Sequence, residues 1–338
     1  MCRIGLIGYG YWGPVLANCF RNAQHPFCTI VDRHPDQYQK IRNACGDVNI
    51  VSSIDEILAD STIEGLVIAL PTSMHYEVCR KALLAGKHVL LEKPMTSSAA
   101  HAEELNTLAD ELGLTLMVDH HFVYKKSVRR IKSLVDSQTF GTLDYYESTR
   151  ANWGIFRKDD DVVWDLLPHD LSILKYVIGR DPISVSAVGS CHVEPGKTDM
   201  AHVNLFYEDN FAAHVFVSWL APEKLRTVYI GGAQGVALFD DNEPIYKLKT
   251  CGISHRYFEN TGVLLEKGSW QAEEDTVNAL ACVAEEFVRC IQTGERPLSD
   301  GRFALDIINT IEAVQKSIGL NGQPVSVINN GYKKGGVL

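Results

Sequence analysis

Short aliphatic runs alternate with amphipathic stretches over the first 120 residues of the chain. A short aliphatic run is typical of a buried strand, whereas apolar residues spaced three or four positions apart are typical of a helix. The predicted strands are Ile4–Ile7, Phe27–Val31, Leu66–Leu70, Val89–Leu91 and Leu114–Val118, and the predicted helices lie near residues 12–22, 35–44, 73–85 and 97–112. This alternation predicts a parallel sheet covered by helices on both faces.

Beyond residue 120 the pattern changes to closely spaced strands in which apolar and polar residues alternate. Strands are predicted near residues 142–151 and at Ile183–Cys191, Ala201–Tyr207, Ala212–Trp219, Arg226–Ile230 and Val236–Phe239, and helices near residues 124–136, 165–178, 273–293 and 301–318. Such strands favour an antiparallel sheet with one face open to solvent or to a partner. We therefore predict an α/β chain of two domains, residues 1–120 and residues 121–338, the second with a large, mostly antiparallel open sheet.

The composition is that of a globular protein, because 46% of the 338 residues are hydrophobic and 22% are charged. A chain of this length is long enough for about two domains with full cores. The formal net charge of −10 argues against nucleic acid as the main partner, since nucleic-acid-binding proteins usually present a basic face.

No apolar stretch reaches the length of about 20 residues that a membrane helix needs, and no secretory signal is visible before the first strand. The nine cysteines are scattered and form no Cys-x-x-Cys pair, so neither a metal site nor a disulfide framework is predicted. We expect a cytoplasmic protein without a membrane partner.

Gly8, Gly10 and Gly13 form a Gly-x-Gly-x-x-Gly motif between the first predicted strand and the first predicted helix. In this context Gly8 permits a tight turn, Gly10 leaves room for a pyrophosphate, and Gly13 lets the helix lie close to the strand. The dipole and free N–H groups at the helix start attract the diphosphate. We expect a Rossmann domain whose loop residues Tyr11 and Trp12 contact the cofactor; a glycine turn without a ligand is the alternative.

Asp32 ends the second predicted strand, nineteen positions after Gly13. An acidic residue there accepts hydrogen bonds from the adenosine ribose and repels a 2′-phosphate, which favours NAD over NADP. The adjacent Arg33 can stack on adenine or pair with that phosphate, so NADP stays open.

Pro71 follows the strand predicted at Leu66–Leu70 and is expected at the same crevice. Thr72 or Ser73 is predicted to cap the helix that follows. His75 is expected either to line the cofactor site or to lie on the surface of that helix.

Glu92, Lys93 and Pro94 follow the apolar run that ends at Leu91. Strands of a doubly wound sheet present ligand-binding residues at their carboxyl ends, so the ammonium group of Lys93 is expected to point into the crevice. Pro94 restricts the conformation of Lys93, and the bond between them is a candidate for the cis form. The alternative is a lysine that merely begins a solvent-exposed loop.

Asp165 and His169 lie in the segment Trp164–Asp170, which opens the most apolar helix of the second half. Pro168 is expected in the first helical turn, which would place the helix start near Asp165. The two side chains are then one turn apart, and a histidine beside a carboxylate is suited to accepting a proton from an alcohol. The alternative is that Asp165 caps the helix and His169 is a buried polar residue.

The chain resembles the glucose-fructose oxidoreductase / inositol dehydrogenase family, also called Gfo/Idh/MocA. The resemblance rests on three motifs in this order and spacing: the glycine motif, Glu92-Lys93-Pro94, and Asp165-x-x-x-His169. The resemblance implies a Rossmann domain, a C-terminal domain with a large open sheet, and NAD or NADP bound at the edge of the Rossmann sheet. It also implies action on sugars, cyclitols or nucleotide-linked sugars, with Lys93 and His169 catalytic and Asp165 assisting.

Two further details qualify this resemblance. The segments Tyr11–Pro14 and Val217–Pro222 look like a branch associated with surface-polysaccharide and sugar-nucleotide metabolism. Leu70 stands where many relatives have threonine, and Asp119-His120-His121 replaces a segment that often contains glycine.

Our hypothesis is an NAD(P)-dependent oxidoreductase that acts on a secondary hydroxyl of a sugar, in which His169 is the acid/base and Lys93 polarises the oxygen. Candidate substrate contacts are Tyr124, Arg150, Asn152, Trp153 and Asp170. The alternatives are a cyclitol dehydrogenase of the inositol type and a dinucleotide-sensing regulator without activity. A homodimer or homotetramer is expected, formed through an open face of the sheet that carries Phe206, Phe216 and Trp219. The sequence leaves open whether these three side chains face the partner or the core.

Overall fold

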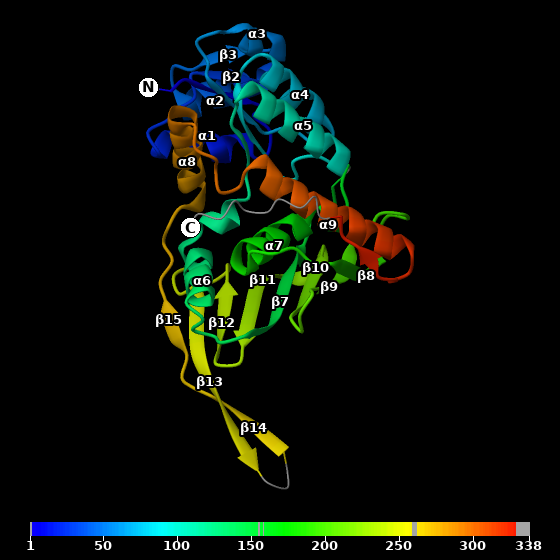
Figure 1. Ribbon diagram of the computed structural model, residues 1–338. Coiled ribbons are helices and arrows are strands. Elements are labelled where there is room, and N and C mark those ends of the chain that lie inside the picture. Colours follow the sequence, from blue (N-terminus) through cyan, green and yellow to red (C-terminus); the bar gives the residue numbers. More distant parts are fainter. Residues whose placement is uncertain (1, 155, 158, 259–261, 329–338) are drawn as a thin grey trace. The chain divides into compact units, whose positions relative to one another are not determined.

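The computed structural model describes residues 2–154, 156–157, 159–258 and 262–328 (Figure 1). The chain divides into two compact units, each with its own core. The first unit consists of Met1–Arg129, Lys158–Asp160 and Thr276–Ile308, and the second of Arg130–Arg157, Asp161–Asp275 and Asn309–Leu338. The division into two domains at residue 120 stays a prediction.

A parallel sheet of six strands, in the order β3-β2-β1-β4-β5-β6, forms the centre of the first unit. Its strands are β1 (Ile4–Ile7), β2 (Thr29–Val31), β3 (Asn49–Val51), β4 (Gly65–Ile68), β5 (His88–Leu91) and β6 (Leu116–Val118). Every residue of β1, β2 and β4 is buried, which is why these strands are continuous apolar runs. The predicted parallel sheet is confirmed.

Helices cover both faces of this sheet (Figure 1). They are α1 (Gly13–Asn22), η1 (Pro35–Gln37), α2 (Tyr38–Cys45), α3 (Ile54–Ala59), α4 (Thr72–Leu84), α5 (Ala99–Leu112), η2 (His121–Tyr124) and α8 (Ala279–Thr293). The sequence analysis missed β3 and α3, which are only three and six residues long. Short elements of this kind carry too few positions to show a period.

A segment from the C-terminal part of the chain completes the first unit. The backbone N–H of Val118 in β6 donates to the carbonyl oxygen of Ser299 at 2.8 Å, and Met117 pairs antiparallel with Asp300. The outer edge of β6 is therefore paired rather than exposed, which removes a site for unwanted strand addition.

A sheet of ten strands forms the second unit, in the order β14-β13-β12-β11-β7-β10-β9-β8-β16, with β15 paired to β13. The strands are β7 (Leu143–Trp153), β8 (Ser184–Ser190), β9 (Met200–Phe206), β10 (Ala212–Ser218), β11 (Leu220–Gly232), β12 (Gly235–Asp240), β13 (Leu248–Phe258), β14 (Gly262–Lys267), β15 (Gln271–Glu273) and β16 (Val325–Ser326). Within this sheet, β7 and β10 form the one parallel pair among the described strands. The predicted mostly antiparallel sheet is confirmed, although β13 to β16 were not predicted.

One face of the large sheet is covered and the other is open. Helix α7 (Val162–Ile178) packs against β7, β9 and β10 (Figure 1). Helices α6 (Lys126–Asp136) and α9 (Gly301–Gly319) each begin in the first unit and end in the second. Phe206 is 41% exposed, on the open face, and Phe216 stacks on His202 with ring centroids 4.6 Å apart. Trp219 is only 1% exposed, so of the two alternatives left open, the partner face and the core, it takes the core.

Helix α7 begins earlier than predicted. Asp161 caps it by accepting hydrogen bonds from the N–H groups of Val163 and Trp164, both at 3.0 Å. Asp165 is therefore not the cap, and Pro168 lies inside the helix rather than in its first turn. The prediction failed because Asp161 is a better capping signal than the proline.

Within the described ranges, no helix is both long enough and apolar enough to cross a membrane.

Candidate active site

The three loop glycines meet different surroundings at the carboxyl end of β1. Gly8 has a φ of +98°, and a Cβ there would lie 2.5 Å from the carbonyl oxygen of Ala69. A Cβ on Gly13 would lie 2.4 Å from the carbonyl oxygen of Gly8, whereas one on Gly10 would meet nothing within 4 Å. Gly8 and Gly13 are thus required by the fold itself, while Gly10 faces the open space in which a diphosphate fits.

The start of α1 has no side-chain cap, although Pro14 lacks an N–H and the Val15 N–H donates to the carbonyl oxygen of Trp12 at 3.0 Å. Its N-terminal residue Trp12 makes no side-chain capping bond, and the first turn contains no acidic residue. The indole Nε1 of Trp12 is buried and has no hydrogen-bond partner within the described part of the chain. Uncapped N–H groups at the positive end of a helix, beside an unsatisfied buried donor, fit a dinucleotide cofactor.

Asp32 is buried and holds the glycine loop in place. Its carboxylate accepts a hydrogen bond from the N–H of Tyr9 at 2.9 Å and another from the N–H of His34 at 2.8 Å. Arg33 is exposed, with its Nε 3.3 Å from Nε2 of His34. The carboxylate keeps further lone pairs for ribose hydroxyls, so its structural role and its predicted cofactor role are compatible.

His75 fixes the turn that carries Lys93. It is only 1% exposed, and its ring nitrogens lie 2.8 Å from the carbonyl oxygen of Pro94 and 2.9 Å from that of Leu70. Its predicted alternative place on the helix surface is therefore wrong. Burial lowers the pKa of His75, and a neutral imidazole carries one N–H, so it donates to only one of these two carbonyl oxygens at a time. His75 thus lies between the end of β4 and the Lys93–Pro94 turn, whose peptide bond is cis.

Glu92 belongs to a cluster of buried ionisable groups that the sequence analysis did not assemble. Burial raises the pKa of Glu92 well above its usual value, and the negative charge of Asp119 raises it further. Asp119 lies 3.7 Å from Nδ1 of His121, and the His121 ring lies over that of Trp12 with centroids 6.4 Å apart. The only sequence signal for this cluster was the departure from the family pattern at residues 119–121.

Pro71 is exposed at the start of α4. Neither Thr72 nor Ser73 caps that helix, because the structure shows no side-chain capping bond there. Instead the Thr72 hydroxyl donates to the carboxylate of Asp160 at 3.1 Å. The prediction of a Thr72 or Ser73 cap was therefore wrong.

Asp165 and His169 lie one turn apart on α7, as predicted. Oδ2 of Asp165 accepts a hydrogen bond from the indole Nε1 of Trp219 at 3.1 Å. Oδ1 lies 3.5 Å from Nε of Arg157. His169 is half-buried. Helix α7 thus carries a histidine one turn after a carboxylate that is held from two directions.

Three of the predicted substrate contacts are buried. Tyr124 is 1% exposed, and its hydroxyl lies 3.2 Å from that of Ser299. Arg150 donates through Nε to Asp170 at 2.6 Å, and both side chains are almost fully buried. We correct the expectation for Tyr124, Arg150 and Asp170, because a side chain without accessible surface holds the fold rather than a substrate.

Asn152 and Trp153 remain candidates for substrate contacts. Both lie at the end of β7, where Asn152 is half-buried and Trp153 is 75% exposed. Lys93 belongs to the first unit, whereas Asp165, His169, Asn152 and Trp153 belong to the second.

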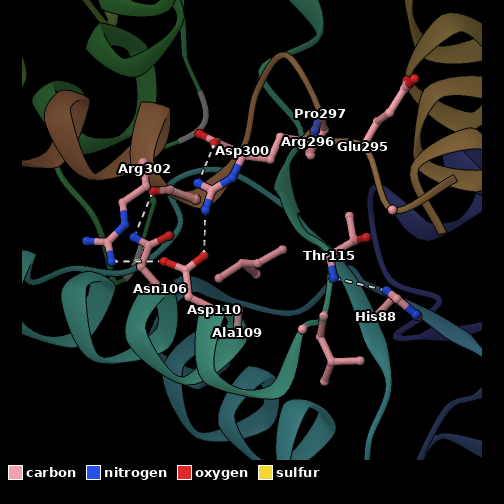
Figure 2. Close-up of a pocket in the computed structure, with 15 residues that line it drawn as sticks. His88, Asn106, Ala109, Asp110, Thr115, Glu295, Arg296, Pro297, Asp300 and Arg302 are labelled. Carbon is pink, nitrogen blue, oxygen red and sulfur yellow. Dashed lines mark hydrogen bonds and ion pairs between the residues drawn. The ribbon is translucent and has the colours of Figure 1, made fainter. Parts of the chain in front are cut away.

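A pocket of about 220 Å³ lies at the opposite edge of the Rossmann sheet (Figure 2). His88 at the start of β5 and Leu116 at the start of β6 line it, whereas the glycine loop follows the carboxyl end of β1. Figure 2 shows Arg296 and Arg302 directed toward Asp110, at 3.0 and 3.1 Å. This pocket is therefore separate from the candidate cofactor crevice.

Comparison with known proteins identifies the family. Residues 2–120 match the profile described as an oxidoreductase family with an NAD-binding Rossmann fold, and residues 128–238 match that of the GFO/IDH/MocA C-terminal domain. The chain belongs to the Gfo/Idh/MocA family. The matched Rossmann region contains the whole glycine loop, Asp32 and Lys93, so the first unit is a NAD-binding domain.

Relatives of this Gfo/Idh/MocA protein include sugar and cyclitol dehydrogenases. UDP-N-acetylglucosamine 3-dehydrogenase of Acidithiobacillus ferrooxidans is 28% identical over 88% of this chain and 91% of its own. Its solved structure superposes with a TM-score of 0.77 at 25% identity, covering 94% of this chain and 97% of that one. The NADP-dependent scyllo-inositol 2-dehydrogenase of Bacillus subtilis is 27% identical over 61% of this chain and 60% of its own.

Other matches extend over less of the relative. An uncharacterised oxidoreductase of Schizosaccharomyces pombe is 32% identical over 52% of this chain and 50% of its own. The chain therefore spans only half to about three fifths of the length of several curated relatives that it matches.

Proposed function

We propose that this protein is an NAD(P)-dependent oxidoreductase that converts a secondary hydroxyl of a sugar to a ketone, or performs the reverse reaction. The observation that carries the proposal is the pair formed by Asp165 and His169 on α7, with both carboxylate oxygens of Asp165 engaged. This pair lies in the second unit, and the first unit of the same chain is a NAD-binding Rossmann domain.

The proposed residues divide the reaction between them. His169 accepts the hydroxyl proton, and Asp165 stabilises the imidazolium that forms. The ammonium group of Lys93 stabilises the substrate oxygen as the carbonyl forms. The nicotinamide, when bound, receives the hydride from the carbon that carried the hydroxyl. In the reverse direction His169 returns the proton.

The glycine loop, the start of α1 and Asp32 would hold the dinucleotide. The open space at Gly10 would receive the diphosphate, and the Asp32 carboxylate would accept hydrogen bonds from the ribose. The remaining proposed contacts with the cofactor come from Tyr11, Trp12, Pro71 and Glu92. His75 contributes indirectly, by holding the turn that carries Lys93. The charge of Asp32 favours NAD, and Arg33 keeps NADP as the alternative.

We infer a nucleotide-linked sugar as the leading substrate class. The longest of the matches described above is to a UDP-N-acetylglucosamine 3-dehydrogenase. A free cyclitol is the second candidate, favoured by the similarity to scyllo-inositol 2-dehydrogenase. Turnover measured with nucleotide-linked sugars and with free inositols, each with NAD and with NADP, separates the two.

Kinetics of Lys93→Ala and His169→Ala variants test the catalytic assignment. Loss of a general base typically costs a factor of about 100 to 10,000, so we expect kcat to fall by at least about 100-fold in the His169 variant. Lys93→Ala is expected to reduce kcat/KM similarly. His101→Ala, a surface histidine of α5, serves as the matched control with normal kinetics.

Near-normal turnover in both site variants would refute the assignment. Dinucleotide binding by the wild-type protein without turnover on any sugar or cyclitol would instead favour a sensing regulator.

We further propose a homo-oligomer that assembles through the open face of the large sheet. This face exposes large apolar side chains, with exposed fractions of 53% for Val188, 41% for Phe206, and 37% for both Tyr145 and Tyr229. Such a surface suits a second copy of the chain.

The net charge of −10 supports the absence of a nucleic-acid partner. The free thiols of the nine cysteines support a cytoplasmic location.

A further inference from the structure

Trp219 lies at the junction of β10 and β11, beneath the Asp165 carboxylate. The indole is only 1% exposed, and its Nε1 donates to Oδ2 of Asp165 at 3.1 Å. The backbone N–H of Trp219 donates to the carbonyl oxygen of Asp199 at 2.9 Å, so the indole is held at both its ring and its backbone. A buried, fixed donor of this kind leaves the accepting carboxylate little freedom to rotate.

The same tryptophan holds the segment that follows β7. The N–H of Gly154 donates to the carbonyl oxygen of Trp219 at 2.9 Å, and a Cβ on Gly154 would lie 2.7 Å from the indole. The ring of Phe156 packs edge-on against the indole, with centroids 5.3 Å apart. Only a glycine allows the chain to approach the indole this closely, so residue 154 and the indole fit together.

Arg157 approaches the other oxygen of the same carboxylate from this segment. Its Nε lies 3.5 Å from Oδ1 of Asp165, and its side chain is 44% exposed. A partly exposed pair at this distance is weak. The shorter hydrogen bond from the buried indole is therefore the stronger restraint on Asp165, and Trp219 also contacts Gly154 and Phe156, which precede Arg157.

We propose that Trp219 is a positioning residue of the active site, which acts on the reaction by fixing the orientation of Asp165 relative to His169. The inference rests on the proposed dehydrogenase function and adds a residue to it. Because the indole is buried, it affects the substrate through Asp165 rather than by contact.

The alternative is a purely structural tryptophan, whose buried N–H needs some acceptor and finds Asp165. The two cases differ in how the substitutions combine. A positioning residue has no function left when Asp165 is removed, whereas a structural residue disturbs the protein whether or not Asp165 is present.

The test is a double-mutant cycle of Trp219→Phe and Asp165→Ala, with kcat and KM measured for the sugar substrate found in the turnover screen. Loss of a hydrogen bond to a charged group corresponds to about a tenfold to hundredfold change, so we expect Trp219→Phe to lower kcat by about tenfold or more with KM little changed. In the Asp165→Ala background it is expected to have no further effect. Trp270→Phe, which alters a partly exposed indole, is the matched control with normal kcat.

The outcomes are distinguishable. Independent effects of the two substitutions, or normal kcat in Trp219→Phe, would overturn the inference. Full activity of Asp165→Ala would instead contradict the role of Asp165 in the proposed function. Should Trp219→Phe fail to fold, benzothienylalanine at position 219 keeps the ring shape and lacks only the N–H, and the same loss of kcat is then expected.

Discussion

Glu92 shows at the scale of single residues how neighbours decide the charge of a side chain. It lies next to Lys93, and its Oε2 accepts a hydrogen bond from the Lys93 N–H at 3.2 Å. Burial and the charge of Asp119 raise the pKa of Glu92 well above 4.5. The folded protein therefore binds this proton more tightly than the unfolded chain does, and the glutamic acid costs stability once it must ionise.

Glu92→Gln is predicted to remove this pH dependence. The stabilisation by the bound proton is complete below the unfolded pKa and is lost as the pH rises through the raised folded pKa. Glutamine keeps the shape and never ionises, so the variant is expected to match the wild type near pH 4 and to be more stable than the wild type at alkaline pH. Thermal unfolding measured across this range checks it.

The matched control is Glu77→Gln, the same chemical change at an exposed site of α4. It is expected to leave the pH dependence of the unfolding temperature unaltered. A Glu92→Gln protein whose unfolding temperature follows the wild type at every pH would show that Glu92 ionises without cost.

Local chemistry was predictable from the sequence where one residue type satisfies a backbone requirement. The separate roles assigned to Gly8 and Gly13 agree with the close backbone contacts that the structure shows. The burial of Tyr124 and of the Arg150–Asp170 pair was not predictable, because their partners lie 175 and 20 positions away in the chain. A polar residue beside a motif does not reveal whether it faces solvent or such a partner.

Ion pairs join the elements of the first unit around the pocket in Figure 2. Arg302 at the start of α9 reaches two acidic residues of α5, Glu103 at 2.6 Å and Asp110 at 3.1 Å. Arg296, from the preceding loop, reaches Asp110 at 3.0 Å. These pairs hold the C-terminal segment beside the Rossmann helices.

Arg302→Gln is predicted to lower the free energy of unfolding by about 1 to 2 kcal/mol, because it removes two hydrogen-bonded pairs from a side chain that is only 24% exposed. Arg296→Gln is the matched control. Its side chain is 55% exposed, and the expected loss is below about 1 kcal/mol. Denaturant unfolding of the two variants measures both values, and equal effects would contradict the ranking.

The long elements were predictable from periodicity, and their ends and the shortest elements were not. The start of α7 was misplaced because the proline was weighted above Asp161, four residues before the predicted start near Asp165. The antiparallel pairing of Met117 with Asp300 joins residues far apart in the chain. Such pairing depends on tertiary packing, which local patterns do not encode.

The proposed oligomer belongs to the scale of the whole molecule. An exposed apolar sheet face buries its surface when a second copy covers it. Phe206→Glu places a charge on that face, at the end of β9, and is predicted to yield a monomer, as measured by sedimentation velocity. Leu84→Glu, at a 56% exposed site of α4, is expected to leave the assembly unchanged, and a monomeric wild-type protein would contradict the proposal.

Family membership and the fold class were predictable because three ordered motifs and two distinct periodicities span the chain. The face that a given aromatic side chain occupies was not predictable. Trp219 and Phe206 fall in similar predicted strands, Ala212–Trp219 and Ala201–Tyr207, yet they are 1% and 41% exposed. The substrate was not predictable either, because the motifs supply the hydride and proton chemistry that many sugars share.

The most direct test of the central claim is the formation of reduced nicotinamide when the purified wild-type protein is incubated with NAD or NADP and a panel of nucleotide-linked sugars and cyclitols. We predict substrate-dependent reduction of the dinucleotide that the His169→Ala variant does not support. Tight dinucleotide binding with no reduction on any member of the panel would contradict the account.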